Sequence, residues 1–157
     1  MKTVVILDNV RSVMNVGSIF RTANALKIEK IYLCGITPTP LDKYGKPRND
    51  FSKVALGAEK TVAWEHAENT KELLKKLRED GYYVLAIEQS EKAVDYKKIN
   101  IEKEKNVAFL VGAEVEGISQ EVLNEASVIA EIPMLGTKES LNVTIAFAVA
   151  TYRILGV

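Results

Sequence analysis

This sequence of 157 residues has little of what several classes of protein need. It contains one cysteine and one histidine, so it can form no internal disulfide, and His66 has no partner at the spacing of a metal site. A single cysteine fits a reducing compartment, and we expect a cytoplasmic protein. Its 21 basic and 21 acidic residues cancel, so the chain as a whole has no net attraction for a nucleic acid. Contact with RNA or DNA would need a local basic patch or a second subunit.

From the sequence we also expect no leader, no membrane span, no internal repeat and no linker. Its first residues lead directly into a β-rich run rather than into a signal peptide. The apolar run over 141–155 is too short to span a bilayer and contains four polar residues, Asn142, Thr144, Thr151 and Arg153. We therefore expect no membrane contact and a single domain over residues 1–157, with no separate RNA-binding domain.

Short β-rich runs alternate with helical runs, which is typical of an α/β fold with a mostly parallel sheet flanked by helices. Runs rich in Val, Ile, Leu and Tyr predict six strands, at Thr3–Leu7, Lys30–Cys34, Thr61–Trp64, Tyr82–Ile87, Val107–Val111 and Ser127–Ile132.

The spacing of apolar residues predicts the helices. One runs from an N-cap at Asn15 to about Lys27, and an amphipathic one covers Asn69–Asp80 and ends at Gly81. Ser119 is predicted to cap a short third helix. The stretch Ile36–Asp50 is predicted to be irregular.

The last predicted helix, from about Leu141 to Leu155, is apolar nearly all round. Val143, Phe147, Ala150 and Ile154 lie on one side, and Ile145, Ala148, Val149 and Tyr152 cover much of the rest. A helix without a polar face must be buried on both sides. We expect one side to meet the sheet and the other a second subunit, which predicts a homodimer. Cover by a neighbouring helix of the same chain is the alternative.

Three stretches hold nearly all the residues that suggest chemistry rather than packing. They are Met14–Thr22, Gly112–Gly117, and Ile132–Gly136 followed by Ser140–Val143. The second stretch follows a strand, as a dinucleotide-binding loop does, but Glu114 occupies the position where that loop needs glycine, and a carboxylate there would repel a pyrophosphate. The sequence therefore argues against a nicotinamide or flavin dehydrogenase. Residues 136–140 do not match a P-loop either.

Together, in this order and at this spacing, the three stretches resemble the motifs of the SPOUT-class, TrmH/SpoU-type RNA 2′-O-ribose methyltransferases. The resemblance covers residues 3–155. It implies S-adenosylmethionine as cofactor, the ribose 2′-hydroxyl of a structured RNA (a tRNA or an rRNA) as methyl acceptor, and a C-terminal trefoil knot that forms the cofactor pocket. A base-nitrogen methyltransferase of the wider SPOUT class and a non-catalytic RNA-binding module with the same fold are the alternatives.

Five residues are predicted to bind the cofactor. In the family, the residues that match Gly112, Ile132 and Leu141 do so. Ile132, Met134 and Leu141 can line an apolar slot for an adenosine, while Gly112 and Gly136 allow close approach of the backbone.

Five polar residues are predicted to be catalytic: Arg21, Asn15, Glu114, Ser140 and Asn142. The arginine matching Arg21 is the family's catalytic residue. A guanidinium stays protonated, so pairing with an RNA phosphate and stabilising the developing oxyanion suit Arg21 better than base catalysis. Gly17 is predicted to open space for it. The structural alternative is that Arg21 is a solvated charge or forms an ion pair with Glu29 or another carboxylate.

The other polar candidates have less definite roles. Glu114 could accept the ribose proton or orient Arg21. Ser140 and Asn142 could be only caps at a helix start. A buried strand cysteine is usually inert, so Cys34 is not expected to be a nucleophile. Four basic residues are expected to grip the RNA, Lys43, Lys46, Arg48 and Lys53.

Overall fold

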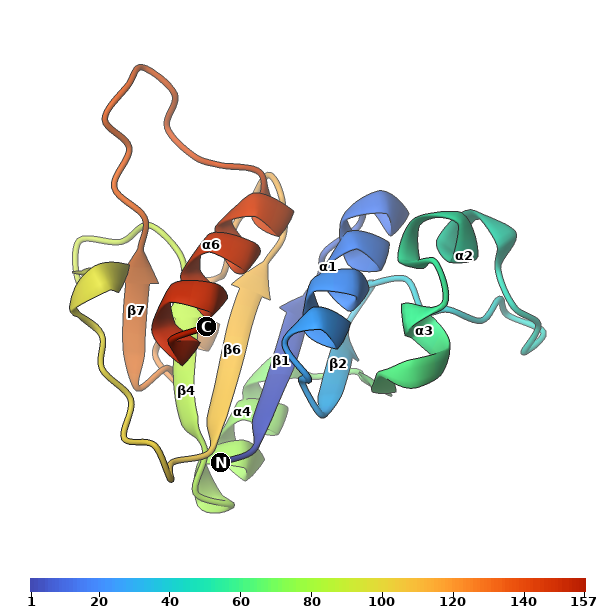
Figure 1. Cartoon of the computed structure of the whole chain (residues 1–157), viewed down its shortest axis with the longest axis horizontal. Helices are drawn as coiled ribbons and strands as arrows, with labels where there is room; N and C mark the ends of the chain where they lie inside the picture. The colour runs from blue at the N-terminus through green and yellow to red at the C-terminus, as the bar shows by residue number, and fades with distance from the viewer.

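The computed structural model describes residues 1–157 and contains a seven-stranded sheet in which all neighbouring strands are parallel (Figure 1). The order is β3-β2-β1-β6-β4-β7-β5. The strands are β1 (Thr3–Asp8), β2 (Lys30–Cys34), β3 (Ala63–Ala67), β4 (Tyr83–Ile87), β5 (Val94–Asp95), β6 (Val107–Gly112) and β7 (Val128–Glu131). The prediction of an α/β fold with a parallel sheet is confirmed.

The two central strands, β1 and β6, are buried along their whole length, which explains why both are almost continuously apolar. They pair in register, with Asp8 opposite Gly112 at their carboxyl ends. The first and second motif stretches therefore leave the sheet side by side, although about a hundred residues separate them in sequence.

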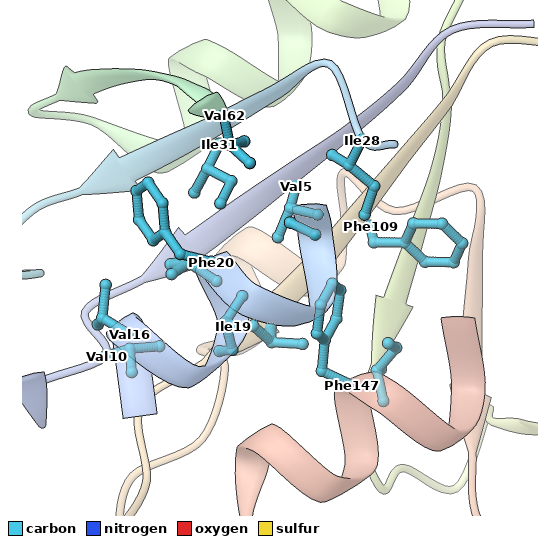
Figure 2. Close-up of a cluster of buried hydrophobic side chains, with 14 of the residues drawn as sticks. Val5, Val10, Val16, Ile19, Phe20, Ile28, Ile31, Val62, Phe109 and Phe147 are labelled. Atoms are coloured by element: carbon cyan, nitrogen blue, oxygen red, sulfur yellow. The ribbon is translucent and has the colours of Figure 1, made fainter. Parts of the chain in front are cut away.

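Helices cover both faces of the sheet. Against one face lie α1 (Val13–Ala25), α2 (Asn49–Ala55), α3 (Ala58–Thr61) and α6 (Val143–Leu155), whose apolar residues join a cluster of 24 buried side chains. Figure 2 shows Ile19 and Phe20 of α1 and Phe147 of α6 gathered with Val5, Ile31 and Phe109 of the sheet. The other face carries α4 (Thr70–Glu79) and α5 (Gln120–Leu123) on a second cluster of 13. A single 3-10 turn, η1, covers Tyr96–Lys98. None of these helices has both the length and the apolar character needed to cross a membrane.

The first helix begins earlier than predicted. Its N-cap is Ser12, whose Oγ accepts a hydrogen bond from the Asn15 backbone N–H at 3.2 Å. The prediction of Asn15 as N-cap is wrong, because Val13 packs against the core and extends the helix by nearly one turn. Asn15 lies inside the first turn, which leaves its side-chain amide free to act elsewhere.

The role predicted for Gly17 is also wrong. A Cβ built at Gly17 would lie 2.9 Å from Cβ of Val54 and 3.2 Å from the Ala55 backbone nitrogen. The missing side chain therefore lets α2 pack directly on α1 and does not open space for Arg21.

Other boundaries also differ from prediction. β3 begins at Ala63 because Thr61 ends α3, and α2, α3 and the two-residue β5 were not predicted. The last helix begins at Val143 with Asn142 as its N-cap, so Ser140 does not cap it. Asn69 and Ser119 cap α4 and α5, the latter as predicted.

Candidate active site

A cavity of about 900 Å³ lies at the carboxyl edge of the sheet, among the segments that follow β4, β6 and β7. Ligands of open parallel sheets bind at this edge. The start of α6 completes the wall with Val143 and Ala146. Parts of the second and third motif stretches therefore face one space.

Four of the five predicted cofactor residues line this cavity: Gly112, Ile132, Met134 and Leu141. Gly112 is buried, and a Cβ there would come within 2.9 Å of the Ile118 backbone nitrogen, so only glycine lets the 113–118 loop fold back over the strand end. Gly136 lies elsewhere, in the exposed part of the loop between β7 and α6, and does not line the cavity.

Glu114 connects the second motif stretch to the first. Its Oε2 accepts a hydrogen bond from the Arg11 backbone N–H at 3.1 Å, and its Oε1 accepts from the Ser12 backbone N–H and from Nδ2 of Asn15, each at 3.0 Å. The carboxylate therefore binds backbone donors at the start of α1, where negative charge is favoured. Glu114 forms no hydrogen bond with Arg21.

These contacts keep Glu114 ionised. Burial alone would raise the pKa of Glu114, but the hydrogen bonds from Arg11, Asn15 and Ser12 outweigh it and lower the pKa below its ordinary value of 4.5. A carboxylate held in this way is a weak base. Its geometry suits positioning of Asn15 better than acceptance of a ribose proton.

Asn15 also reaches the third motif stretch. Its Oδ1 accepts a hydrogen bond from Nδ2 of Asn142 at 3.4 Å. Oδ1 of Asn142 in turn accepts from the Thr144 backbone N–H at 2.8 Å, which fixes Asn142 at the start of α6. Glu114, Asn15 and Asn142 thus form one chain of hydrogen bonds that joins all three motif stretches.

The remaining two catalytic candidates have no protein partner. Ser140 is exposed at the cavity and forms no hydrogen bond with another side chain or with the backbone. Arg21 lies on the exposed side of α1, outside the cavity lining, and pairs with neither Glu29 nor any other carboxylate. The structure therefore brings Glu114, Ser140 and Asn142 to the cavity and Asn15 to its edge, but leaves Arg21 apart from them.

One cavity residue was missed by sequence reasoning. Glu88 directly follows β4, and its Oε2 accepts a hydrogen bond from the Ile118 backbone N–H at 3.1 Å. Its signal was the same as that of Glu114, a carboxylate just after a buried strand. The cavity lining contains five carboxylates and only one lysine. The carboxylates are Glu88, Glu91, Glu114, Glu116 and Glu139, and the lysine is Lys92.

The comparison with known families decides how this site is classified. The model of the SpoU rRNA Methylase family matches residues 2–152. This chain belongs to the SpoU rRNA Methylase family. The resemblance drawn from the three motif stretches is confirmed.

Relatives within the SpoU family differ in length and in name. A tRNA (guanosine(18)-2'-O)-methyltransferase of Thermus thermophilus is 33% identical over 149 residues, which are 95% of this chain and 72% of that protein. TrmH-family relatives from Staphylococcus aureus are 28% identical over 98% of this chain, and the chain spans 58% of their length. The AdoMet-bound rRNA methyltransferase from Sinorhizobium meliloti superposes with a TM-score of 0.86 at 31% identity, covering 98% of this chain and 55% of that one.

Proposed function

We propose that this chain transfers a methyl group from S-adenosylmethionine to a ribose 2′-hydroxyl of a tRNA or an rRNA. The observation that carries the proposal is the hydrogen-bond chain Glu114–Asn15–Asn142 beside the cavity. The relative from Thermus thermophilus is a tRNA 2'-O-methyltransferase, which supports the proposed substrate class. The relative from Sinorhizobium meliloti is an rRNA methyltransferase bound to AdoMet, which supports the proposed cofactor.

The cavity fits S-adenosylmethionine in size, lining and charge. Its volume lies within the usual range for small-molecule sites, and Ile132, Met134 and Leu141 offer apolar walls for an adenosine. The sulfonium and the ammonium of the cofactor outweigh its single carboxylate, so it carries a net positive charge, which suits a lining with five carboxylates and one lysine. The same lining opposes a pyrophosphate, and this agrees with the exclusion of a dinucleotide.

The bound cofactor supplies an electrophilic methyl group, and the residues of the chain position the acceptor. Ser140 offers a free hydroxyl at the cavity, and Asn142 is held in place through Asn15. Glu114, already satisfied by three donors, acts as a positioning residue for the start of α1. Arg21 has no carboxylate partner and lies outside the cavity lining. The proposal requires the bound RNA to bring a phosphate, and the oxyanion that develops as the hydroxyl loses its proton, to this guanidinium.

Methyl transfer from labelled S-adenosylmethionine to total tRNA and to rRNA tests this proposal. Nuclease digestion of the product identifies the methylated atom, because a 2′-O-methyl group blocks cleavage of the adjacent phosphodiester. We expect label in nuclease-resistant dinucleotides. Label on a base would favour the base-nitrogen alternative, and absence of label from both RNAs would contradict the proposal.

We also propose a homodimer through α6. Ile145, Val149 and Tyr152 follow one another along one side of the helix and are 51%, 39% and 37% exposed. The opposite side, with Phe147, Ala150 and Ile154, is buried on the sheet. A continuous apolar stripe on the surface is typical of a protein interface.

Light scattering on Val149→Glu tests the dimer, since a charge in a desolvated interface is costly. We expect a dimer for the wild type and a folded monomer for Val149→Glu at micromolar concentration. Val94→Glu is a matched control, because Val94 is 38% exposed but lies on the edge strand β5. A monomeric wild type would refute this part of the proposal.

Three further features are proposed with the function. We propose that residues 1–157 act as one methyltransferase domain, because both hydrophobic clusters are built on one sheet. Its place of action is the cytoplasm, where tRNA and ribosomes work. The C-terminal trefoil knot stays a prediction of the family resemblance.

A further inference from the structure

The loop between β2 and α2 presents an aromatic ring to solvent. Tyr44 is 75% exposed and lies in a bridged turn formed by Leu41–Pro47, here called the Tyr44 tip. A tyrosine this exposed contributes little to folding, because its ring buries little area. Its position therefore calls for an explanation outside the core.

The Tyr44 tip is held in shape by the backbone and by one carboxylate. Leu41 and Pro47 form an antiparallel bridge, and the Asp42 backbone N–H donates to the Lys46 carbonyl at 2.8 Å. Oδ1 of Asp42 accepts from the backbone N–H groups of Tyr44 at 2.8 Å and Lys46 at 3.0 Å. Gly45 completes the turn with a φ of +77°. The ring is thus displayed on a preformed turn, so little further ordering is needed when it meets a ligand.

The Tyr44 tip carries two lysines without an ion pair, and the ammonium of one of them lies over the ring. Nζ of Lys43 lies 5.1 Å from the centroid of the Tyr44 ring, and neither Lys43 nor Lys46 forms an ion pair. Arg48 differs, because its guanidinium binds both oxygens of Asp50, at 3.1 and 2.7 Å. Of the four basic residues expected to grip RNA, Arg48 is therefore already partnered, while Lys43, Lys46 and Lys53 remain free.

We propose that the Tyr44 tip docks an unpaired nucleotide of the RNA substrate. Its base would stack on the Tyr44 ring, and Lys43 and Lys46 would contact the adjoining phosphates. Stacking on aromatic rings beside cationic groups is the usual way in which proteins hold unpaired nucleotides. The identity of the partner as RNA rests on the proposed function.

The position of the Tyr44 tip predicts that it contributes to RNA binding rather than to the chemical step. The loop lies at one end of the long axis of the molecule, whereas the 132–142 loop beside the cavity lies toward the other (Figure 1). A contact there anchors the RNA far from the reacting ribose. Removing it should raise the KM for RNA rather than slow the chemical step.

Equilibrium binding of total tRNA and of rRNA fragments tests the proposal. We expect Tyr44→Ala to weaken binding by about 5- to 150-fold, the range that the loss of one stacked base gives, and Tyr44→Trp to retain it. Lys43→Gln combined with Lys46→Gln should reduce the salt dependence of binding, by about 0.7 in log–log slope for each phosphate that the lysines no longer neutralise. Lys103→Gln is the matched control, since Lys103 is an exposed, unpaired lysine on the 101–106 loop.

Melting curves and cofactor affinity show whether each variant is folded. If Tyr44→Ala binds both RNAs as tightly as the wild type, the tip is not an RNA contact, even where methyl transfer is observed. If Tyr44→Ala loses RNA affinity while the wild type transfers no methyl group, the Tyr44 tip is an RNA contact but the proposed methyltransferase function is wrong. A fall confined to kcat would also overturn the role of the tip as a remote anchor.

Discussion

Two cavities lie along the same edge of the sheet, and their polar groups are arranged differently. The larger, of about 900 Å³, is the candidate active site, and the smaller, of about 650 Å³, lies near the starts of α4 and α5. The two share Ala113, Glu116 and Gly117. Twelve of the 25 residues lining the larger cavity are hydrophobic, against three of 16 in the smaller. Only the larger one therefore offers the apolar walls that a small-molecule site needs.

Both cations that line the smaller cavity are held in ion pairs with carboxylates of the same cavity. Arg11 binds Glu116, and Lys71 binds Glu121, each at 3.0 Å. In the larger cavity Glu88, Glu91, Lys92 and Glu139 form no ion pair. Charges that neutralise one another leave little for a ligand, whereas unpaired groups remain available to one. We infer that the smaller cavity has a structural role and that the larger one is the ligand-binding site.

The largest expected effect concerns Arg21, the unpaired cation of α1. Arg21→Ala should reduce the rate of methyl transfer by about 100-fold or more, the scale of a lost oxyanion donor, with thermal stability nearly unchanged. Arg21→Lys should restore part of the rate, because a point charge lacks the bidentate fork. Single-turnover rates beside melting curves measure both.

The control for Arg21 is Lys71→Ala, which removes a paired cation of the smaller cavity. We expect it to leave the rate close to that of the wild type. An Arg21→Ala enzyme with the wild-type rate would show that an unpaired charge is no guide to catalysis here.

The next effect concerns the apolar wall of the larger cavity. Leu141→Asp should weaken binding of S-adenosylmethionine by about tenfold or more, because a carboxylate would replace an apolar contact. Ile36→Asp introduces the same change in the smaller cavity, where Ile36 is 61% exposed, and should have no effect on cofactor affinity. Calorimetry measures the affinity of each variant for S-adenosylmethionine. Equal losses for both variants would contradict the assignment of the cofactor to the larger cavity.

A smaller effect is expected at Asp8, in the lining of the smaller cavity. Burial raises the pKa of Asp8, and the hydrogen bond from Thr70 Oγ1 at 2.5 Å only partly opposes this. For an acid with a raised pKa, the folded protein loses stability as pH rises through the window between the unfolded and the folded pKa. Asp8→Asn should therefore raise the free energy of unfolding at pH 7 by about 1 kcal/mol, which is measured as a higher melting temperature. Its advantage over the wild type should shrink as the pH falls below that window.

Glu114 should show the opposite pH dependence, with the smallest effect. The lowered pKa of Glu114 gives stability that is present above its ordinary value of 4.5 and is lost as pH falls through the folded pKa. Glu114→Gln should lower stability at pH 7 by about 1 kcal/mol or less, because the side chain is exposed to solvent. Melting curves from pH 7 to acid should converge for the two proteins. Curves that stay parallel would show that ionisation of Glu114 does not hold the start of α1.

Much of the fold could be predicted because its signals are local. β1 and β6 appear as unbroken apolar runs, and the caps Asn69 and Ser119 precede clear helical patterns. A two-residue strand such as β5 carries no such pattern. Ser12 and Asn15 are equally good caps in sequence, and only the packing of Val13 on the core decides between them.

The candidate site could be predicted as a set of residues but not as a geometry. Glu114 meets Asn15 across 99 residues of sequence, and Asn142 meets Asn15 across 127. No local pattern indicates such contacts, so the role of Glu114 as a clamp on α1 was missed. The contact of Gly17 with Val54 was missed for the same reason. The inertness of Cys34, by contrast, could be predicted from its position in an apolar strand alone. Burial raises the pKa of its thiol to about 12.

The direction of α6 has a practical consequence for experiments on immobilised protein. β1 starts at the edge of the sheet opposite the cavity, and α6 runs back from the cavity toward that edge (Figure 1). Residues 1 and 157 therefore both lie away from the carboxyl edge of the sheet, where the cavity is found. A tether at either residue would attach the protein to a sensor surface at a point remote from the candidate site.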